Sequence, residues 1–186
     1  MESKRISVVG NGRLGLSFSL LCNSVGYEVY AYEQNKERAE QIKNRSLKTS
    51  EPQVEELLQH ATLDVTDTLF EAVKTSDLIF ILVATPSLDT GEYDHSQINS
   101  VFEEIEKFDS LYTTGKTFII GATVMPGYCK ELQQRFPTIN IVYQPFFIAQ
   151  GSILKDITYA DIVLIGGNPT DELLDVYDSL MVEEPN

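Results

Sequence analysis

Three glycines near the start of the chain, Gly10, Gly12 and Gly15, have the G-x-G-x-x-G spacing that can cradle a phosphate. They lie between an apolar run, residues 6–9, and a helix-like stretch that begins at Leu16. In this context the first glycine allows a tight turn, the second lets a pyrophosphate approach the backbone, and the third lets helix and strand pack closely. The N–H groups at the helix start then face the phosphates. The alternative interpretation is a glycine turn that binds no ligand.

Glu33 follows the next strand signal, residues 27–32, at about the 20-residue offset expected for an acid that binds a ribose. A carboxylate there accepts hydrogen bonds from both ribose hydroxyls and repels a 2′-phosphate. We therefore predict NAD as the cofactor, in preference to NADP. Lys36 and Arg38 lie just beyond and carry charge that attracts such a phosphate, so this preference needs a test. A solvated acid at a strand end is the less favoured alternative for Glu33.

Composition and charge exclude several classes of function. The chain has 186 residues, the size of one large domain, and a formal net charge of −14. This charge argues against nucleic acid or an anionic membrane surface as the main partner. No apolar run approaches the ~20 residues that span a bilayer, and residues 1–5 have no signal-peptide pattern. We expect a cytoplasmic protein.

The cysteines and histidines do not predict a metal site. Cys22 and Cys129 fall in helix-like segments among apolar neighbours, which indicates buried, reduced thiols. His60 and His95 are isolated in the sequence and have no second ligand at metal spacing. We therefore predict no metal cofactor.

Strand signals alternate with helix signals along the whole chain. This alternation predicts a single α/β domain over residues 1–186, doubly wound, with a mostly parallel Rossmann-type sheet and helices on both faces. Strands are predicted at 6–9, 27–32, 62–65, 77–83, 116–121, 139–143 and 161–166. Helices are predicted at 16–21, 35–43, 53–59, 67–73 (capped by Asp67), 95–108, 126–135 and 171–181. Right-handed crossovers place the carboxyl ends of the strands along one edge, where ligands bind.

The loops at these strand ends carry a more specific pattern. Residues 83–88, with Gly91 and Asp94 after them, resemble the V-x-T-P-S loop of the nucleotide-sugar dehydrogenases, the UDP-glucose/GDP-mannose dehydrogenase family. Residues 122–127 look like the S-T-V-x-P-G segment of that family. Residues 143–151 look like its N-P-E-F segment, in the branch that continues with Ile-Ala.

The resemblance extends from Ile6 to about Gly167, with the matching stretches in the family's order. Asn44 with Glu51 and Pro52 is similar to the family's stretch before the third strand. The resemblance implies a domain that binds NAD and takes part in oxidising the C6 alcohol of a sugar nucleotide to a carboxylate, in two hydride transfers.

Site residues are carried over from this family position by position. The pyrophosphate would be held by Gly10, Gly12, Arg13, Leu14 and Gly15. Glu33 would bind the adenosine ribose, and Arg38 matches a basic position that supports the cofactor. Thr85 and Thr123 would line the nicotinamide half, and Thr123 would have a supporting role in catalysis. From the residues alone, each threonine is also a candidate strand-end cap.

Two departures separate the chain from the family pattern. Phe146 stands where the family has a glutamate that helps carry acid–base and hydrolysis work, and the neighbouring Gln144 and Gln150 are neutral amides. The family also has a long central helix and a second domain that supplies a nucleophilic cysteine, and we expect both to be absent from a chain that stops at Asn186. Cys129 has no histidine near in sequence to activate it, so we predict a packing thiol.

Three interpretations of the function follow. The first is the NAD-binding domain of a nucleotide-sugar 6-dehydrogenase, incomplete by itself, which would act on a sugar nucleotide with a separate C-terminal domain. The second is a stand-alone, catalytically disabled NAD-binding module or subunit, which Phe146 favours. The third is a reduced dehydrogenase that makes one hydride transfer on another small alcohol, and no residue is identifiable as its base.

Overall fold

A six-stranded parallel sheet forms the centre of the computed structural model, which describes residues 4–182. Its strand order is β3-β2-β1-β4-β5-β6, and every neighbouring pair is parallel. The strands are β1 (Arg5–Val9), β2 (Glu28–Tyr32), β3 (Asp64–Thr66), β4 (Leu78–Ile81), β5 (Thr117–Ile120) and β6 (Asn140–Tyr143). The strand order reverses between β1 and β4, which is the switch point where ligands bind in such sheets. The predicted α/β class is confirmed.

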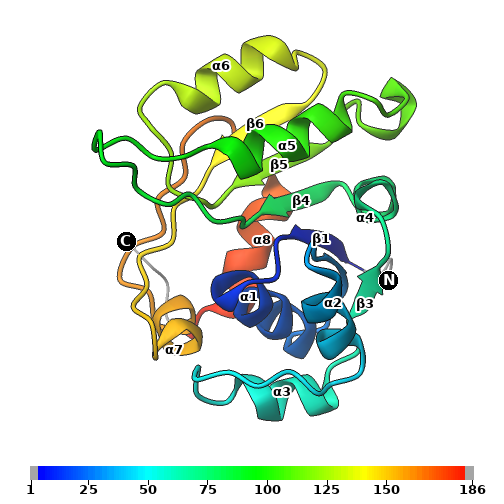
Figure 1. Cartoon of the computed structure of the whole chain (residues 1–186), viewed down its shortest axis with the longest axis vertical. Helices are drawn as coiled ribbons and strands as arrows, with labels where there is room; N and C mark the ends of the chain where they lie inside the picture. Colours follow the sequence, from blue (N-terminus) through cyan, green and yellow to red (C-terminus); the bar gives the residue numbers. More distant parts are fainter. Residues whose placement is uncertain (1–3, 183–186) are drawn as a thin grey trace.

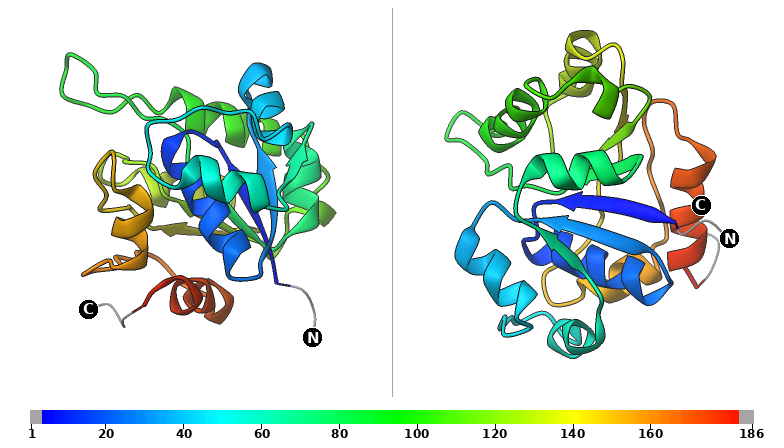
Figure 2. Two further views of the ribbon diagram at one scale, coloured as in Figure 1. Left: turned by 90° about the horizontal axis from the view of Figure 1, so that it is seen from below. Right: turned by 90° about the vertical axis from the view of Figure 1, so that its right-hand side faces the viewer.

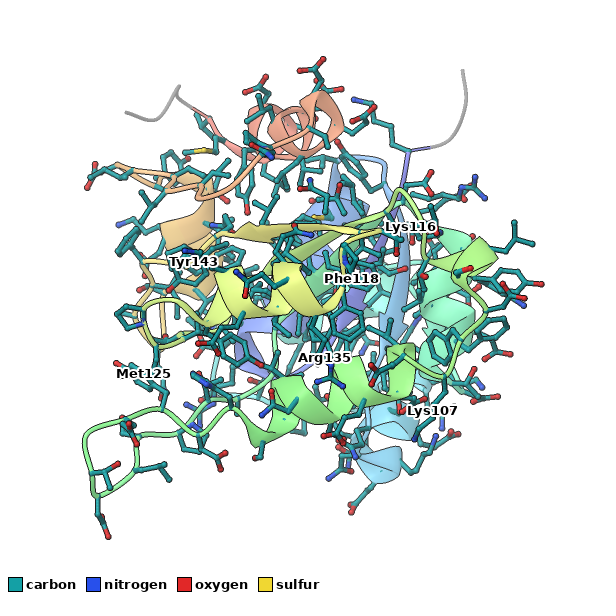
Figure 3. The ribbon with its side chains drawn as sticks, turned by 90° about the horizontal axis from the view of Figure 1, so that it is seen from above. Lys107, Lys116, Phe118, Met125, Arg135 and Tyr143 are labelled. Carbon is teal, nitrogen blue, oxygen red and sulfur yellow. The ribbon has the colours of Figure 1, made fainter. Side chains whose placement is uncertain are left out.

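Helices cover both faces of the sheet (Figures 1 and 2). One face carries α1 (Arg13–Ser24), α7 (Ile153–Thr158) and α8 (Asp171–Leu180), which share an apolar cluster with Phe18, Phe80 and Val142. The other face carries α4 (Leu69–Thr75), α5 (Ser96–Ile105) and α6 (Tyr128–Arg135), which share a second cluster with Phe102 and Phe118. Figure 3 views the molecule from the β6 side, with α8 on one side of β6 and α5 and α6 on the other, and Phe118 of β5 belongs to the cluster on the α5 and α6 side. The central strands are buried on both sides, which explains their almost wholly apolar sequences.

Two further helices lie on the β3 side of the molecule. They are α2 (Lys36–Lys43), which follows β2, and α3 (Val54–His60), which packs against α1. Leu16 and Leu20 of α1, Leu58 of α3 and Leu154 of α7 belong to one apolar cluster. This cluster therefore joins α1, which begins at the glycine turn, to α7.

The predicted strand at 161–166 is wrong. Its residues form only an isolated antiparallel bridge, between Gly166 and Tyr143 at the end of β6. The bridge joins the last residue of the predicted strand to the last residue of β6, so residues 161–165 extend past the carboxyl end of β6, where no strand lies beside them. Residues 162–165 are a continuous apolar run, but Ile162 and Leu164 are about half exposed because no neighbouring strand covers this segment.

Two helix details also differ from expectation. The helix predicted from Asp67 begins at Leu69 as α4, and its cap is Thr68. The Thr68 hydroxyl accepts from the Glu71 N–H, and the Glu71 carboxylate accepts from the Thr68 N–H, each at 3.2 Å. This capping box satisfies two backbone donors reciprocally, which a cap at Asp67 does not. The six-residue helix α7 and a 3₁₀ turn at Ser110–Tyr112 were not predicted, because such short segments show little periodicity.

Across residues 4–182, every helix is too short or too polar to cross a bilayer.

Candidate functional site

A cleft of about 420 Å³ opens at the carboxyl ends of β1, β2 and β4. The residues that line it include Gly10, Gly12, Arg13, Glu33, Arg38 and Ala84. The cleft therefore lies at the switch point of the sheet, and it brings together the glycine turn after β1 with the acid after β2.

The three glycines of the turn lie in different surroundings. Gly10 has a φ of +89°, and a Cβ atom there would lie 2.8 Å from the Leu82 carbonyl oxygen. A Cβ at Gly15 would lie 1.9 Å from the Gly10 carbonyl oxygen, so only glycine lets α1 approach the turn this closely. A Cβ at Gly12 would meet nothing within 4 Å. Gly10 and Gly15 are thus required by packing, whereas the space beside Gly12 is open to a ligand.

The start of α1 provides unpaired backbone donors. Gly12 is its N-cap residue and has no side chain to cap the helix, and no acid lies in the first turn. The first N–H groups of a helix have no partner within the helix, and the helix dipole adds partial positive charge. This arrangement is the one that binds phosphate groups at helix N-termini.

Asn11 holds the glycine turn together, a role that was not predicted from the sequence. Its side chain is fully buried, and its amide nitrogen donates to the carbonyl oxygens of Val8 and Tyr32, each at 3.1 Å. Its amide oxygen accepts from the Ser19 hydroxyl at 2.9 Å. One side chain thus ties β1, β2 and α1 together. A turn-forming amide between the two glycines was the available signal.

Glu33 and Arg38 are anchored to the backbone of Asn11. The Glu33 carboxylate accepts from the N–H groups of Asn11 and Asn35, each at 2.9 Å. The Arg38 Nε donates to the Asn11 carbonyl oxygen at 2.7 Å. A carboxylate has about four acceptor positions, so Glu33 retains capacity for ribose hydroxyls. Lys36 donates to the Asp67 carbonyl oxygen at 2.9 Å and is not part of the cleft lining.

The remaining predicted residues lie outside this lining. Leu14 is half-buried and packs against the α1, α7 and α8 cluster. Thr85 follows Ala84, where the cleft ends, and Thr123 is exposed in the loop after β5. In Figure 3, Met125 of that loop and Tyr143 mark this end of the sheet, and Lys116 marks the opposite end. The nicotinamide-binding role of the two threonines stays a prediction.

Phe146 packs into the fold and exposes no acid–base group. Its ring lies edge-on to Phe18 of α1, with 5.4 Å between the ring centroids. A Cβ atom at Gly121 would lie 3.0 Å from the same ring, so the glycine makes room for it. Phe146 is therefore part of the packing between α1 and the end of β5.

His95 is isolated in sequence but not in the structure. Its Nε2 accepts from the Met125 N–H at 3.2 Å, and its ring lies 4.1 Å from that of Tyr128. The Tyr128 hydroxyl donates to Asn99 at 2.7 Å, and burial raises the pKa of Tyr128 to about 12. These contacts join the loop after β4 to the loop after β5.

Both thiols lie in apolar surroundings. Cys22 of α1 is fully buried, and burial raises its pKa well above the ordinary value. Cys129 of α6 is partly buried against the second cluster, and burial raises its pKa from 9.0 to about 11. A raised pKa means that the thiol keeps its proton at neutral pH, which disfavours nucleophilic chemistry.

We therefore expect Cys129 to alkylate slowly. A shift from 9.0 to about 11 lowers the thiolate fraction at neutral pH by about a hundredfold, because each pKa unit is a factor of ten. Iodoacetamide should modify the folded protein much more slowly than a free thiol, with a rate that rises until the pH approaches the raised pKa. Mass spectrometry of Cys22→Ser isolates the Cys129 reaction. Rapid modification at neutral pH would show that Cys129 is activated.

Comparison with protein families matches almost the whole chain to one of them. Residues 4–181 match the model of the NAD binding domain of the UDP-glucose/GDP-mannose dehydrogenase family. A UDP-glucose 6-dehydrogenase from Streptococcus pneumoniae is 25% identical over 173 residues, which cover 91% of this chain and 43% of that protein.

Solved structures give the same result. A UDP-glucose dehydrogenase from Pyrobaculum islandicum superposes with a TM-score of 0.88 at 25% identity, over 99% of this chain and 45% of that one. A GDP-mannose dehydrogenase from Pseudomonas aeruginosa, in a ternary complex, superposes with a TM-score of 0.81 at 25% identity. The match covers 97% of this chain and 46% of that one. The chain thus spans less than half the length of these relatives.

Proposed function

Because the chain belongs to the UDP-glucose/GDP-mannose dehydrogenase family, as an NAD-binding domain, we propose that it serves a nucleotide-sugar 6-dehydrogenase as its hydride-accepting unit. NAD, when bound, accepts the hydride from the sugar C6. In this proposal the glycine turn and Arg13 bind the pyrophosphate, Glu33 binds the adenosine ribose, and Arg38 supports the cofactor. Thr85 and Thr123 line the nicotinamide half. Sugar-nucleotide binding and turnover would require further polypeptide.

The observation that carries this proposal is the cleft itself. It places the uncapped start of α1 and the open space at Gly12 beside the Glu33 carboxylate. Backbone N–H groups suit an anionic pyrophosphate, and an anchored acid suits the two ribose hydroxyls. These are the two ends of one adenosine diphosphate, so the chemistry of the lining fits a dinucleotide.

A second candidate function is a stand-alone NAD-binding module or subunit without catalysis of its own. Phe146 favours it, because the ring at this position packs against Phe18 and offers no proton acceptor. Both candidates require the same cofactor site, and they differ in whether a further domain completes an active enzyme.

Glu33 is expected to set the choice between NAD and NADP. The unmodified chain should bind NADH more tightly than NADPH by about tenfold or more, because a 2′-phosphate would meet a like charge held in place by two N–H groups. Glu33→Gln keeps the shape and one acceptor but removes the charge, so it should narrow this ratio mainly by improving NADPH binding. Titration calorimetry measures both affinities.

Glu56→Gln on α3 is the matched control, since it removes one exposed acid outside the cleft. The ratio of NADH affinity to NADPH affinity in Glu56→Gln should equal that of the unmodified chain. Equal or tighter binding of NADPH by the unmodified chain would refute the assigned role of Glu33.

A further inference from the structure

Gln150 is the residue through which a distant loop reaches the pyrophosphate end of the cleft. We propose that Gln150 is a positioning residue for the cofactor, which holds the Arg13 guanidinium in place to bind the pyrophosphate. This inference rests on the proposed function. The Gln150 Oε1 accepts a hydrogen bond from Arg13 Nη1, although the two residues are 137 positions apart. Arg13 opens α1 and lines the cleft beside Gly12.

Two carboxylates fix the backbone on either side of Gln150. The Glu51 carboxylate accepts from the Gly151 N–H with both oxygens, at 3.0 and 2.9 Å. The Asp156 carboxylate accepts from the Ala149 N–H at 2.8 Å and from the Ser152 hydroxyl at 2.7 Å. These two hydrogen bonds lower the pKa of Asp156, so its carboxylate stays charged at neutral pH. The loop at 149–152 is therefore held at both ends, and Gln150 is presented between them.

Glu51 is unusual among the acids of this chain because it is only 4% exposed. A buried carboxylate is costly unless it is hydrogen-bonded, and its partner here is the backbone N–H of Gly151, 100 positions away. Gly151 has a φ of +92°, a conformation that favours glycine and that points this N–H toward Glu51. The cost of burying Glu51 is thus linked to the position of the loop that carries Gln150.

Holding Arg13 matters because of the charge of the whole chain. The net charge of −14 repels an anionic dinucleotide, so local positive groups must supply the attraction. A free arginine loses much rotamer freedom when it binds a phosphate, whereas one already held by Gln150 loses less. A guanidinium has five N–H donors, so one bond to Gln150 leaves donors for the pyrophosphate.

The test is a double-mutant cycle on NADH affinity with the full chain. Gln150→Ala should weaken NADH binding about three- to tenfold, the range expected when one long side chain loses its preorganisation. Arg13→Ala should weaken NADH binding more than Gln150→Ala does. In the Arg13→Ala background, Gln150→Ala should cause no further loss of NADH affinity. A residue that only stabilises the fold would give additive losses instead. Gln134→Ala, an exposed glutamine of α6 outside the cleft, is the matched control and should bind normally.

A second arm tests the clamp. Glu51→Gln keeps the size of the side chain but places a neutral amide against the Gly151 N–H. This variant should therefore weaken NADH binding as Gln150→Ala does. In the Gln150→Ala background, Glu51→Gln should leave NADH affinity unchanged. Circular dichroism checks that each variant is folded. The inference is overturned if Gln150→Ala binds NADH as tightly as the unmodified chain. It is also overturned if Gln150→Ala weakens NADH binding equally in the presence of Arg13 and in the Arg13→Ala background. Either result leaves the proposed function intact. Absence of NADH binding by the unmodified chain overturns both.

Discussion

Gly12→Val is expected to abolish dinucleotide binding while leaving the domain folded. A side chain at Gly12 meets no protein atom within 4 Å, and the backbone φ of −64° is one that any residue adopts. The added isopropyl group would therefore occupy the space that the pyrophosphate needs. Losing several charge-assisted hydrogen bonds should weaken NADH binding by about a hundredfold or more. Calorimetry with NADH measures the loss.

The melting temperature separates this effect from misfolding. Valine is a poorer N-cap than glycine, so a cost of about 1 kcal/mol is expected, which lowers the melting temperature by about 2–4 °C in a domain of this size. Gly15→Ala is the contrasting variant, because its Cβ would lie 1.9 Å from the Gly10 carbonyl oxygen. Gly15→Ala should lower the free energy of unfolding by at least about 1–3 kcal/mol. Near-normal NADH affinity in Gly12→Val would mean that the cofactor binds elsewhere.

The glycine turn and Glu33 could be predicted because their signals are local. A strand, a turn and a helix are adjacent in sequence, and the acid follows at a spacing set by the length of one crossover. Asn11 could not be assigned its role in this way, because its five partner groups come from β1, β2, the residue after β2, α1 and α2, and they meet only in the fold. The contact between Arg13 and Gln150 is hidden for the same reason.

The strand wrongly predicted at 161–166 shows the opposite failure. Its run of four apolar residues is a local signal, but a strand also needs a partner along its length. The segment bridges β6 only at Tyr143, the last residue of that strand, and residues 161–165 extend past its end. The apolar run therefore predicted a strand, but the end of β6 leaves most of the segment without a partner, so no strand forms.

The 186-residue chain by itself is expected not to oxidise UDP- or GDP-sugars at rates typical of the full-length relatives. General acid–base catalysis is typically worth about 10² to 10⁴ in rate, and Phe146, which stands where the resemblance predicts a glutamate, cannot supply it. The thiol of Cys129 is held protonated by its raised pKa of about 11, so it does not substitute for a nucleophile. NADH absorbance with a panel of UDP- and GDP-sugars measures the rate. Robust NADH production would instead support a reduced dehydrogenase with another base.

Phe146→Glu should not restore turnover, and it should destabilise the fold. The ring packs edge-on against Phe18, so the change removes an aromatic contact and places a carboxylate beside a buried aromatic cluster. Full loss of a buried phenyl group costs about 3–5 kcal/mol, and the half-buried Phe146 should lose about 2–3 kcal/mol of unfolding free energy. Phe147→Glu is the matched control, because Phe147 is 62% exposed and its replacement should change stability little. Chemical denaturation compares the two. If Phe146→Glu were as stable as Phe147→Glu, the packing role of Phe146 would be wrong, and the position would be free to carry an acid.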